Sequence, residues 1–196
     1  MNDTEENAIV YSFGIGEDIS FDLAAIEAFR CRIHGFDPTP RCRTWIEQQS
    51  LSENFIFHPV GLAGEEGEIE FFAPENDAHV SYSAQPAPKS NVALKIVAPV
   101  KRLDDLIAEN GSGPPQILKM DIEGFEYDVI EDILRGEFRP RQWLVEFHHR
   151  MYGIPTERTI NAVSRIREAG YKLFYVSPGG HEYGFVYMPE GAHENQ

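Results

Sequence analysis

The sequence predicts an α/β fold built on a doubly wound, mostly parallel sheet with one antiparallel strand. Short apolar runs alternate with stretches of helical periodicity, and this succession of strand–helix units is typical of a parallel sheet. Two of the apolar runs, 8–13 and 117–120, end in glycine or acidic residues just before a helical stretch begins. The last two runs are joined by Ser-Pro-Gly-Gly and predict a hairpin, which supplies the reversed strand.

The composition indicates a globular protein with an acidic surface. At 196 residues the chain is long enough for one domain with a substantial core, so 1–196 is interpreted as a single domain. Its 32 acidic and 17 basic residues give a formal net charge of −15. That balance argues against nucleic acid, which is bound through clustered Lys and Arg, and against an anionic membrane as partners. An acidic surface that serves only to keep the protein soluble explains the net charge fully.

Cysteine usage and the start of the chain predict a cytoplasmic protein. Only Cys31 and Cys42 are present, without CxxC spacing, so we expect neither a disulfide framework nor a structural zinc site. Residues 1–7 lack the basic start and apolar core of a signal peptide. No apolar run approaches the length needed to span a bilayer.

The first strand–helix unit contains a glycine turn. Residues 8–13 form an apolar run, the turn follows at 14–16, and 19–29 carry apolar residues at helical spacing, with Asp18 or Ser20 as candidate caps. Glycines in such a turn let the backbone pass close to a ligand. The third glycine of the dinucleotide-binding fingerprint is missing, so a tight turn without a ligand explains the pattern about as well.

The second strand ends in an acidic residue at a suggestive spacing. Residues 31–36 predict a strand, and Asp37 lies 21 positions beyond Gly16. An acid on this strand tip can accept hydrogen bonds from both hydroxyls of a ribose. The alternative is that Asp37 only begins the Asp-Pro turn. With a glycine turn upstream, we favour the ribose role.

The middle of the chain predicts one further helix and three strands. We expect the helix at 39–49, a strand at 54–60, and two strands that pair with each other at 68–72 and 92–98. In a doubly wound sheet, the Gly-Leu-Ala-Gly sequence at 61–64 would lie beside the base of a bound nucleotide. Residues 73–91 are the longest irregular stretch, and a substrate-facing flap and a plain insertion are equally plausible there.

The stretch on which the prediction depends most is 116–130. A helix at 101–110 leads to the apolar strand 117–120, which ends in Asp121, Glu123 and Gly124 before a helix that runs to Arg135. Ligands of open parallel sheets bind at the carboxyl ends of the strands. The chain continues with a strand at 142–147, a helix at 156–169, and hairpin strands at 171–176 and 183–188.

Residues 118–126, Leu-Lys-Met-Asp-Ile-Glu-Gly-Phe-Glu, closely resemble the signature of the FkbM-type methyltransferases. The runs 102–106 and 144–148 also look like the family pattern, and the resemblance covers nearly the whole chain. It implies a seven-stranded Rossmann-like sheet, S-adenosylmethionine as cofactor, and O-methylation of a hydroxyl on a sugar, glycolipid or polyketide-like small molecule.

The resemblance also implies which residues form the site. The expected cofactor-binding residues are Ser12, Gly14, Gly16, Asp18, Asp37, Gly61, Leu62 and Asp121. For catalysis, we expect His148 or Asp121 to take the proton of the acceptor hydroxyl and Glu146 to orient the acceptor. An unperturbed imidazole has a pKa of about 6.5, which suits a base.

The chain departs from the family pattern in two places. Family members commonly have an acid at the start of the glycine turn, where this chain has Ser12, so Glu17 or Asp18 is expected to share its work. The first strand also begins close to the start of the sequence, which leaves little room for a helical lid. We expect cover over the cofactor from residues 73–91 or from a partner subunit of a homo-oligomer.

Other interpretations stand beside this one. Glu126 is interpreted as a first-turn acid favoured by the helix dipole, Glu123 is undecided, and His149 is expected to face away from His148. Asp121, Glu146 and His148 would also suit a divalent cation, as in magnesium-dependent sugar O-methyltransferases. A non-catalytic cofactor-binding module and a nicotinamide-dependent oxidoreductase are the remaining alternatives.

Overall fold

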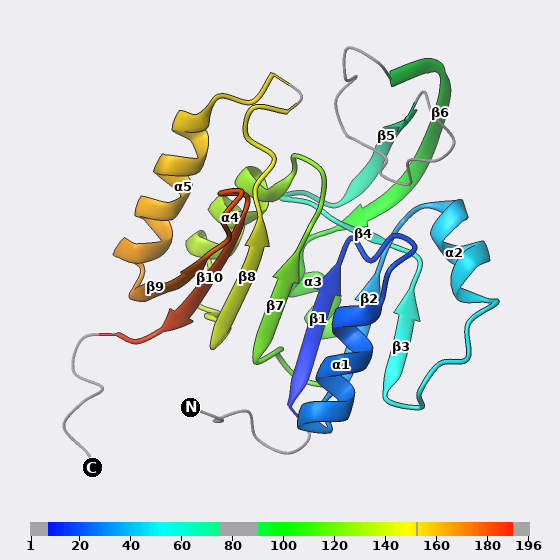
Figure 1. Ribbon diagram of the computed structural model, residues 1–196, viewed down its shortest axis with the longest axis horizontal. Helices are drawn as coiled ribbons and strands as arrows, with labels where there is room; N and C mark the ends of the chain where they lie inside the picture. Colours follow the sequence, from blue (N-terminus) through cyan, green and yellow to red (C-terminus); the bar gives the residue numbers. More distant parts are fainter. Residues whose placement is uncertain (1–7, 75–89, 152, 190–196) are drawn as a thin grey trace.

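The computed structural model describes residues 8–74, 90–151 and 153–189, and their main feature is a seven-stranded sheet (Figure 1). The strand order is β3-β2-β1-β7-β8-β10-β9, and only β10 runs antiparallel to its neighbours. The predicted fold class is therefore confirmed. The strands are β1 (Ile9–Phe13), β2 (Arg32–Phe36), β3 (Phe55–His58), β7 (Ile117–Met120), β8 (Gln142–Glu146), β9 (Tyr171–Val176) and β10 (Glu182–Tyr187).

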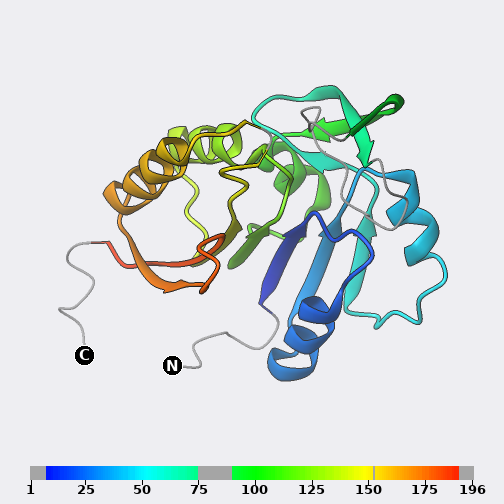
Figure 2. The same ribbon diagram turned by 45° about the horizontal axis from the view of Figure 1, so that its top comes forward.

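Helices cover both faces of this sheet (Figures 1 and 2). One face packs against α1 (Ser20–Phe29) and α2 (Pro40–Ile46). The other packs against α3 (Leu103–Asn110), α4 (Glu126–Arg135) and α5 (Thr156–Glu168). Within the described residues, no helix is long and apolar enough to cross a membrane.

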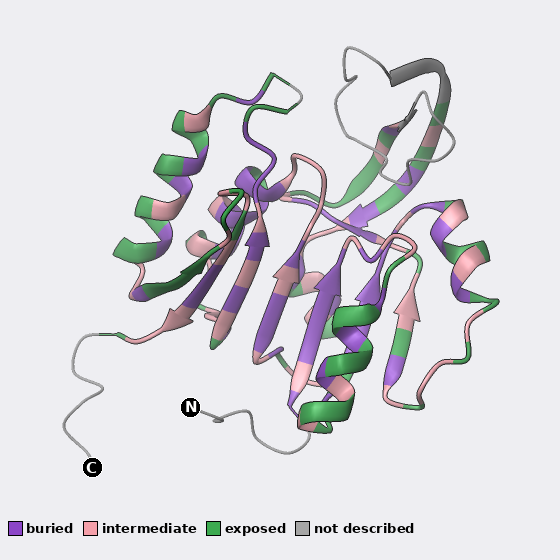
Figure 3. Ribbon diagram, viewed as in Figure 1, coloured by how far each residue is buried: buried purple, intermediate pink, exposed green. Residues whose placement is uncertain are grey.

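The central strands are apolar because both of their faces are buried (Figure 3). In β1, Val10 joins the core under α1 and α2, whereas Tyr11 and Phe13 join the core under α3, α4 and α5. This alternation follows from the two-residue period of a strand. A strand buried on both faces is read from sequence as a continuous apolar run, which is why 8–13 was recognisable.

A second, three-stranded sheet stands beyond the carboxyl ends of the main strands (Figure 1). It contains β4 (Gly61–Leu62), β5 (Gly67–Pro74) and β6 (Ser90–Lys101). The predicted pairing of 68–72 with 92–98 is confirmed as an antiparallel ladder, and both strands are longer than expected. Residues 73–74 and 90–91 belong to these strands and not to an irregular stretch, while 75–89 lie outside the described residues.

Several predicted boundaries are corrected in this region. Gly61 and Leu62 pair with the end of β6 as a short parallel strand, which the sequence did not predict. Because β6 continues to Lys101, α3 begins two residues later than predicted, at Leu103. Helix α2 ends at Ile46, three residues short of the prediction; at its start, the hydroxyl of Thr39 accepts a hydrogen bond from the backbone N–H of Cys42.

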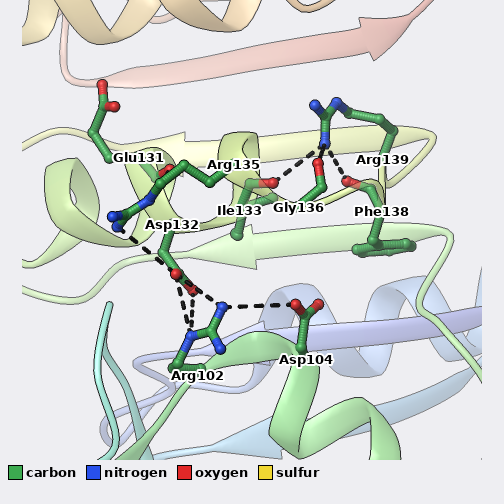
Figure 4. A network of polar contacts seen from close by, with 9 residues as sticks. All are labelled: Arg102, Asp104, Glu131, Asp132, Ile133, Arg135, Gly136, Phe138 and Arg139. Carbon is green, nitrogen blue, oxygen red and sulfur yellow. Dashed lines mark hydrogen bonds and ion pairs between the residues drawn. The ribbon is translucent and has the colours of Figure 1, made fainter.

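An arginine that precedes α3 holds two helices together (Figure 4). The guanidinium of Arg102 lies 3.0–3.2 Å from both carboxylate oxygens of Asp132 in α4. Arg139 then donates to the backbone oxygens of Ile133 and Gly136 at the end of the same helix (3.2 and 2.7 Å). The Arg102 contact is a bidentate pair, so this part of the family-like run 102–106 acts in helix docking.

The order of the strands reverses between β1 and β7. From β1 the chain builds outward to β2 and β3, and it then returns to place β7 on the other side of β1. Helices leave the two strands in opposite directions at such a point, which opens a crevice at their carboxyl ends. The glycine turn and the acidic end of β7 both lie there.

Candidate active site

A cavity of about 400 Å³ lies at this crevice, between the tips of β1, β2 and β7 and the small sheet. Seven of the eight predicted cofactor-binding residues line it, although they come from distant parts of the sequence. They are Gly14, Gly16, Asp18, Asp37, Gly61, Leu62 and Asp121. The predicted tips therefore meet at one edge of the sheet.

Ser12 does not line this cavity. It is fully buried in β1, and it shares the face of Val10, toward α1. Its neighbour there is Asp22, whose pKa is raised by burial. The expectation of cofactor contact at position 12 is thus corrected, because strand alternation directs this side chain into the core.

The two glycines of the turn serve different purposes. At Gly14 the backbone has φ +75°, and a Cβ there would lie 1.6 Å from the backbone oxygen of Asp121. Glycine is therefore needed for the packing of β1 against β7, and not for the approach of a ligand. At Gly16 (φ +52°) no atom lies within 4 Å of a Cβ position, so this residue faces open space.

Asp37 connects the tip of β2 to the glycine turn. Its Oδ2 accepts a hydrogen bond from the backbone N–H of Gly16 (3.0 Å), and its Oδ1 accepts from the backbone N–H of Thr39 (2.9 Å). Burial raises the pKa of Asp37, and these hydrogen bonds lower it in part. Asp37 therefore orders the Asp-Pro turn, and it also lies on the cavity wall, as a ribose ligand would.

Two more acids line the cavity where α1 begins. Oδ1 of Asp18 accepts from the backbone N–H of Ser20 (2.8 Å), and this hydrogen bond lowers the pKa of Asp18. Glu17 forms a two-point ion pair with Arg41 of α2, at 2.8 and 3.2 Å. Asp18 thus binds the first backbone N–H of α1, whose N-cap residue is Ile19, and Glu17 ties the glycine turn to α2.

The three predicted catalytic residues lie together beside the cavity. Asp121 directly follows β7, and Glu146 is the last residue of the neighbouring parallel strand β8. His148 lies two residues after Glu146. One ligand atom from each lies within 4.8 Å of the others. Nε2 of His148 is 3.6 Å from Oδ1 of Asp121. The expectation that adjacent strand tips bring these groups together agrees with the structure.

The electrostatics of this cluster differ from those of isolated side chains. Burial, followed by the charge of Glu146, raises the pKa of Asp121 to about 7. Burial lowers the pKa of His148, but the hydrogen bond and charge of Glu126 and the charge of Glu123 outweigh it and bring the pKa to about 9. The expectation of an unperturbed imidazole is wrong, because His148 is surrounded by carboxylates and keeps its proton at neutral pH.

Sequence reasoning missed some residues of the site. Phe71 of β5 and Phe125 both line the cavity, with ring centroids 5.8 Å apart. Glu126, interpreted as a dipole-favoured acid, is completely buried and contacts His148. Phe71 lies in a strand that gave no sign of approaching the site. The signal for Glu126 was its place in the signature run, although its position at a helix start offered a simpler explanation.

Comparisons with known proteins agree with this picture. The model of the methyltransferase FkbM domain matches residues 9–173. A fibrillarin pre-rRNA processing protein of Methanococcus jannaschii has a similar fold (TM-score 0.57, 10% identity, 97% of this chain and 70% of that one). A precorrin-6y C5,15-methyltransferase from Geobacter metallireducens is also similar (TM-score 0.50, 11% identity, 95% of this chain and 82% of that one). No curated protein matches the sequence.

The residues around the cavity also fit the cofactor of such enzymes. A turn with open space at Gly16, a carboxylate at the tip of β2, and an apolar wall that includes Phe71 suit a nucleoside joined to an amino acid. The family match covers most of the chain, and the sheet has the matching topology. The chain belongs to the FkbM methyltransferase family, and it is a methyltransferase whose cofactor is S-adenosylmethionine.

Proposed function

We propose that this protein methylates a hydroxyl oxygen of a small molecule, with carbohydrates as the first acceptors to test and glycolipids and polyketides after them. The supporting observation is the position of Asp121. It lies on the wall of the cofactor cavity and also in the cluster with Glu146 and His148. A hydroxyl placed between cavity and cluster is next to both a methyl donor and a base.

The chain's contribution to cofactor binding follows from the cavity wall. Asp37 would hold the ribose by accepting hydrogen bonds from its hydroxyls, Gly61 and Leu62 would hold the adenine, and the turn from Gly14 to Asp18 would hold the amino-acid end. When bound, S-adenosylmethionine supplies a methyl group on a positively charged sulfur.

The cluster's contribution is to align the acceptor and to remove its proton. Alignment of the reacting groups can supply roughly 7–11 kcal/mol of the barrier, and a placed base accelerates the reaction by about 10²–10⁴-fold. Asp121 is the better base, because its pKa of about 7 lies near the working pH whereas His148 is already protonated. Glu146 orients the acceptor hydroxyl.

The proposal is tested with Asp121→Asn and His148→Ala. We expect each to lower kcat by on the order of 10²-fold or more while S-adenosylmethionine still binds in calorimetry. Asp104→Asn, an exposed acid at the start of α3, is the matched control and should keep the wild-type rate. Acceptors are identified by incubating hydroxylated compounds with labelled cofactor and measuring the mass shift. Wild-type rates in both variants would rule the mechanism out.

Two alternatives give different results in the same assays. The ligand atoms of Asp121, Glu146 and His148 are close enough to hold a divalent cation, so a magnesium-dependent sugar O-methyltransferase is the second candidate. A cation would have to displace the proton from His148, and we expect activity to survive thorough chelation. A non-catalytic module would bind the cofactor without turnover on any hydroxyl acceptor.

A further inference from the structure

Glu126 is buried more deeply than its place at a helix start requires. It is the first residue of α4, and it is completely buried, whereas the side chain of Asp128 in the same first turn is 71% exposed. Burying a carboxylate is costly unless it is well paired. Among the described residues Oε2 of Glu126 has no hydrogen-bond partner, so stability alone does not account for this burial.

The other oxygen of Glu126 contacts the catalytic cluster. Oε1 lies 2.7 Å from Nδ1 of the buried His148 and accepts a hydrogen bond from the backbone N–H of Gly124 at 3.0 Å. Since a carboxylate at this pH only accepts hydrogen bonds, Nδ1 of His148 is the donor. The ring is thereby fixed, and Nε2 becomes the atom that faces the other acids.

Nε2 faces two carboxylates on the cavity wall. It lies 3.4 Å from Oε2 of Glu123 and 3.6 Å from Oδ1 of Asp121. Glu123 has φ +52°, a left-handed conformation that is strained for a residue with a side chain. Strain of this kind persists where the surrounding structure holds it, and it is concentrated at functional sites.

We propose that Glu126 is a positioning residue. It holds His148 through Nδ1 so that Nε2 is directed at Asp121 and Glu123, and this contact keeps the carboxylate of Asp121 in place to receive the acceptor's proton. The inference rests on the proposed function and extends it. Glu126 itself does not line the cavity, so it acts through His148.

The test compares Glu126→Gln with Asp128→Asn. The glutamine keeps the size of the side chain, but its amide can donate to Nδ1, which favours a neutral ring that has lost the proton on Nδ1 and keeps the proton on Nε2. We expect kcat to fall by on the order of 10²-fold with the Kd of S-adenosylmethionine changed less than about twofold. Asp128→Asn removes a carboxylate from the same helix turn without touching His148, and it should leave kcat and Kd unchanged.

Coupling between the two residues separates positioning from a general loss of structure. If Glu126 acts through His148, the double variant of Glu126→Gln and His148→Ala should be no slower than His148→Ala alone. If the losses of kcat from the two single substitutions multiply in the double variant, the inference is overturned. A kcat of Glu126→Gln within about threefold of wild type would overturn it as well.

A spectroscopic readout decides the matter without any acceptor. In ¹⁵N NMR of the histidine rings of the wild-type protein, Nδ1 of His148 should carry a proton. In Glu126→Gln, Nδ1 should lose that proton near neutral pH while Nε2 keeps its own. An unprotonated Nδ1 in the wild type would overturn the positioning role even if the variant failed to fold. The absence of methyl transfer to every hydroxyl acceptor would instead refute the proposed function and leave the NMR result standing.

Discussion

At Gly14, one missing side chain determines whether two strands can meet. Any Cβ would collide with the backbone of Asp121, and the N–H of Gly14 donates to the backbone oxygen of Phe36 at 2.9 Å. The turn therefore joins the tips of β1, β2 and β7 before any ligand binds. The sequence shows the glycine, but it cannot show the contact because Gly14 and Asp121 are far apart along the chain.

Another residue-scale feature is a pair of histidines on β2 and β3. Nδ1 of the buried His34 lies 2.9 Å from Nε2 of His58, and their rings stack at 5.1 Å. Burial, followed by the charges of His58 and Arg32, lowers the pKa of His34 to about 4. The folded protein therefore favours the neutral form of His34 more strongly than the unfolded chain does, since an exposed histidine has a pKa of about 6.5.

This shift predicts acid sensitivity with a definite sign. A histidine whose pKa is lowered by folding contributes stability that is fully present above pH ~6.5 and is lost as the pH falls toward 4. Between pH 7.5 and 5 the contribution of His34 to the free energy of unfolding should fall by about 2 kcal/mol. Denaturant titrations of the wild type and of a variant without His34, at the two pH values, measure it.

The control is His34→Phe, which keeps an aromatic ring and removes the titrating group. Asp37, Asp121 and His148, whose pKa values are raised in the folded protein, act in the opposite direction in both proteins, so the difference between wild type and variant isolates His34. We expect the variant to lose about 2 kcal/mol less than the wild type over this interval. Equal losses in the two proteins would contradict the assigned pKa.

At the scale of elements, the small sheet changes the composition of the site. Its strand β5 brings Phe71 to the cavity wall, where the ring lies 5.8 Å from that of Phe125 and belongs to a small core cluster that includes Val100 of β6. Local patterns predicted both strands and their pairing. They could not show that the pair forms a sheet of its own. A pair inside the main sheet and a separate pair have the same local pattern and differ only in their long-range contacts.

Replacing Phe71 tests whether this sheet belongs to the cofactor site. Phe71→Ala removes apolar surface from the wall and should weaken S-adenosylmethionine binding by roughly tenfold, or about 1.4 kcal/mol. Phe72→Ala is the matched control, because Phe72 does not line the cavity and packs with Lys95. Calorimetry measures both. Equal affinities in the two variants would exclude the small sheet from cofactor binding.

The elements also show which parts of the site could be predicted. Asp121, Glu146 and His148 were accessible because strand ends and a two-residue spacing are local signals, and parallel neighbours then bring them together. The shifted pKa values of Asp121 and His148 were not accessible. They depend on burial and on the charge of Glu126, and neither can be read from local periodicity.

For the molecule as a whole, the reversal of strand order makes cofactor binding and folding depend on each other. The cavity takes its wall from β1, β2, β7 and the small sheet, so wall residues as far apart in the sequence as Phe13 and Phe125 must be in place to form it. The unfolded chain has no such cavity. A ligand that fits should therefore stabilise the whole fold by mass action.

This linkage predicts a difference between cofactors that thermal unfolding can measure. At about 100 times its Kd, S-adenosylmethionine or its demethylated product should add roughly 2.7 kcal/mol of stability, which for a chain of this size raises the Tm by about 5–11 °C. NAD at the same concentration should leave the Tm within about 1 °C, because a family of methyltransferases has no need for a nicotinamide site. Asp37→Asn should reduce the shift if its carboxylate holds the ribose. An equal shift with NAD would instead favour a general nucleotide pocket, and the chemistry assigned to Asp121 would lose its basis.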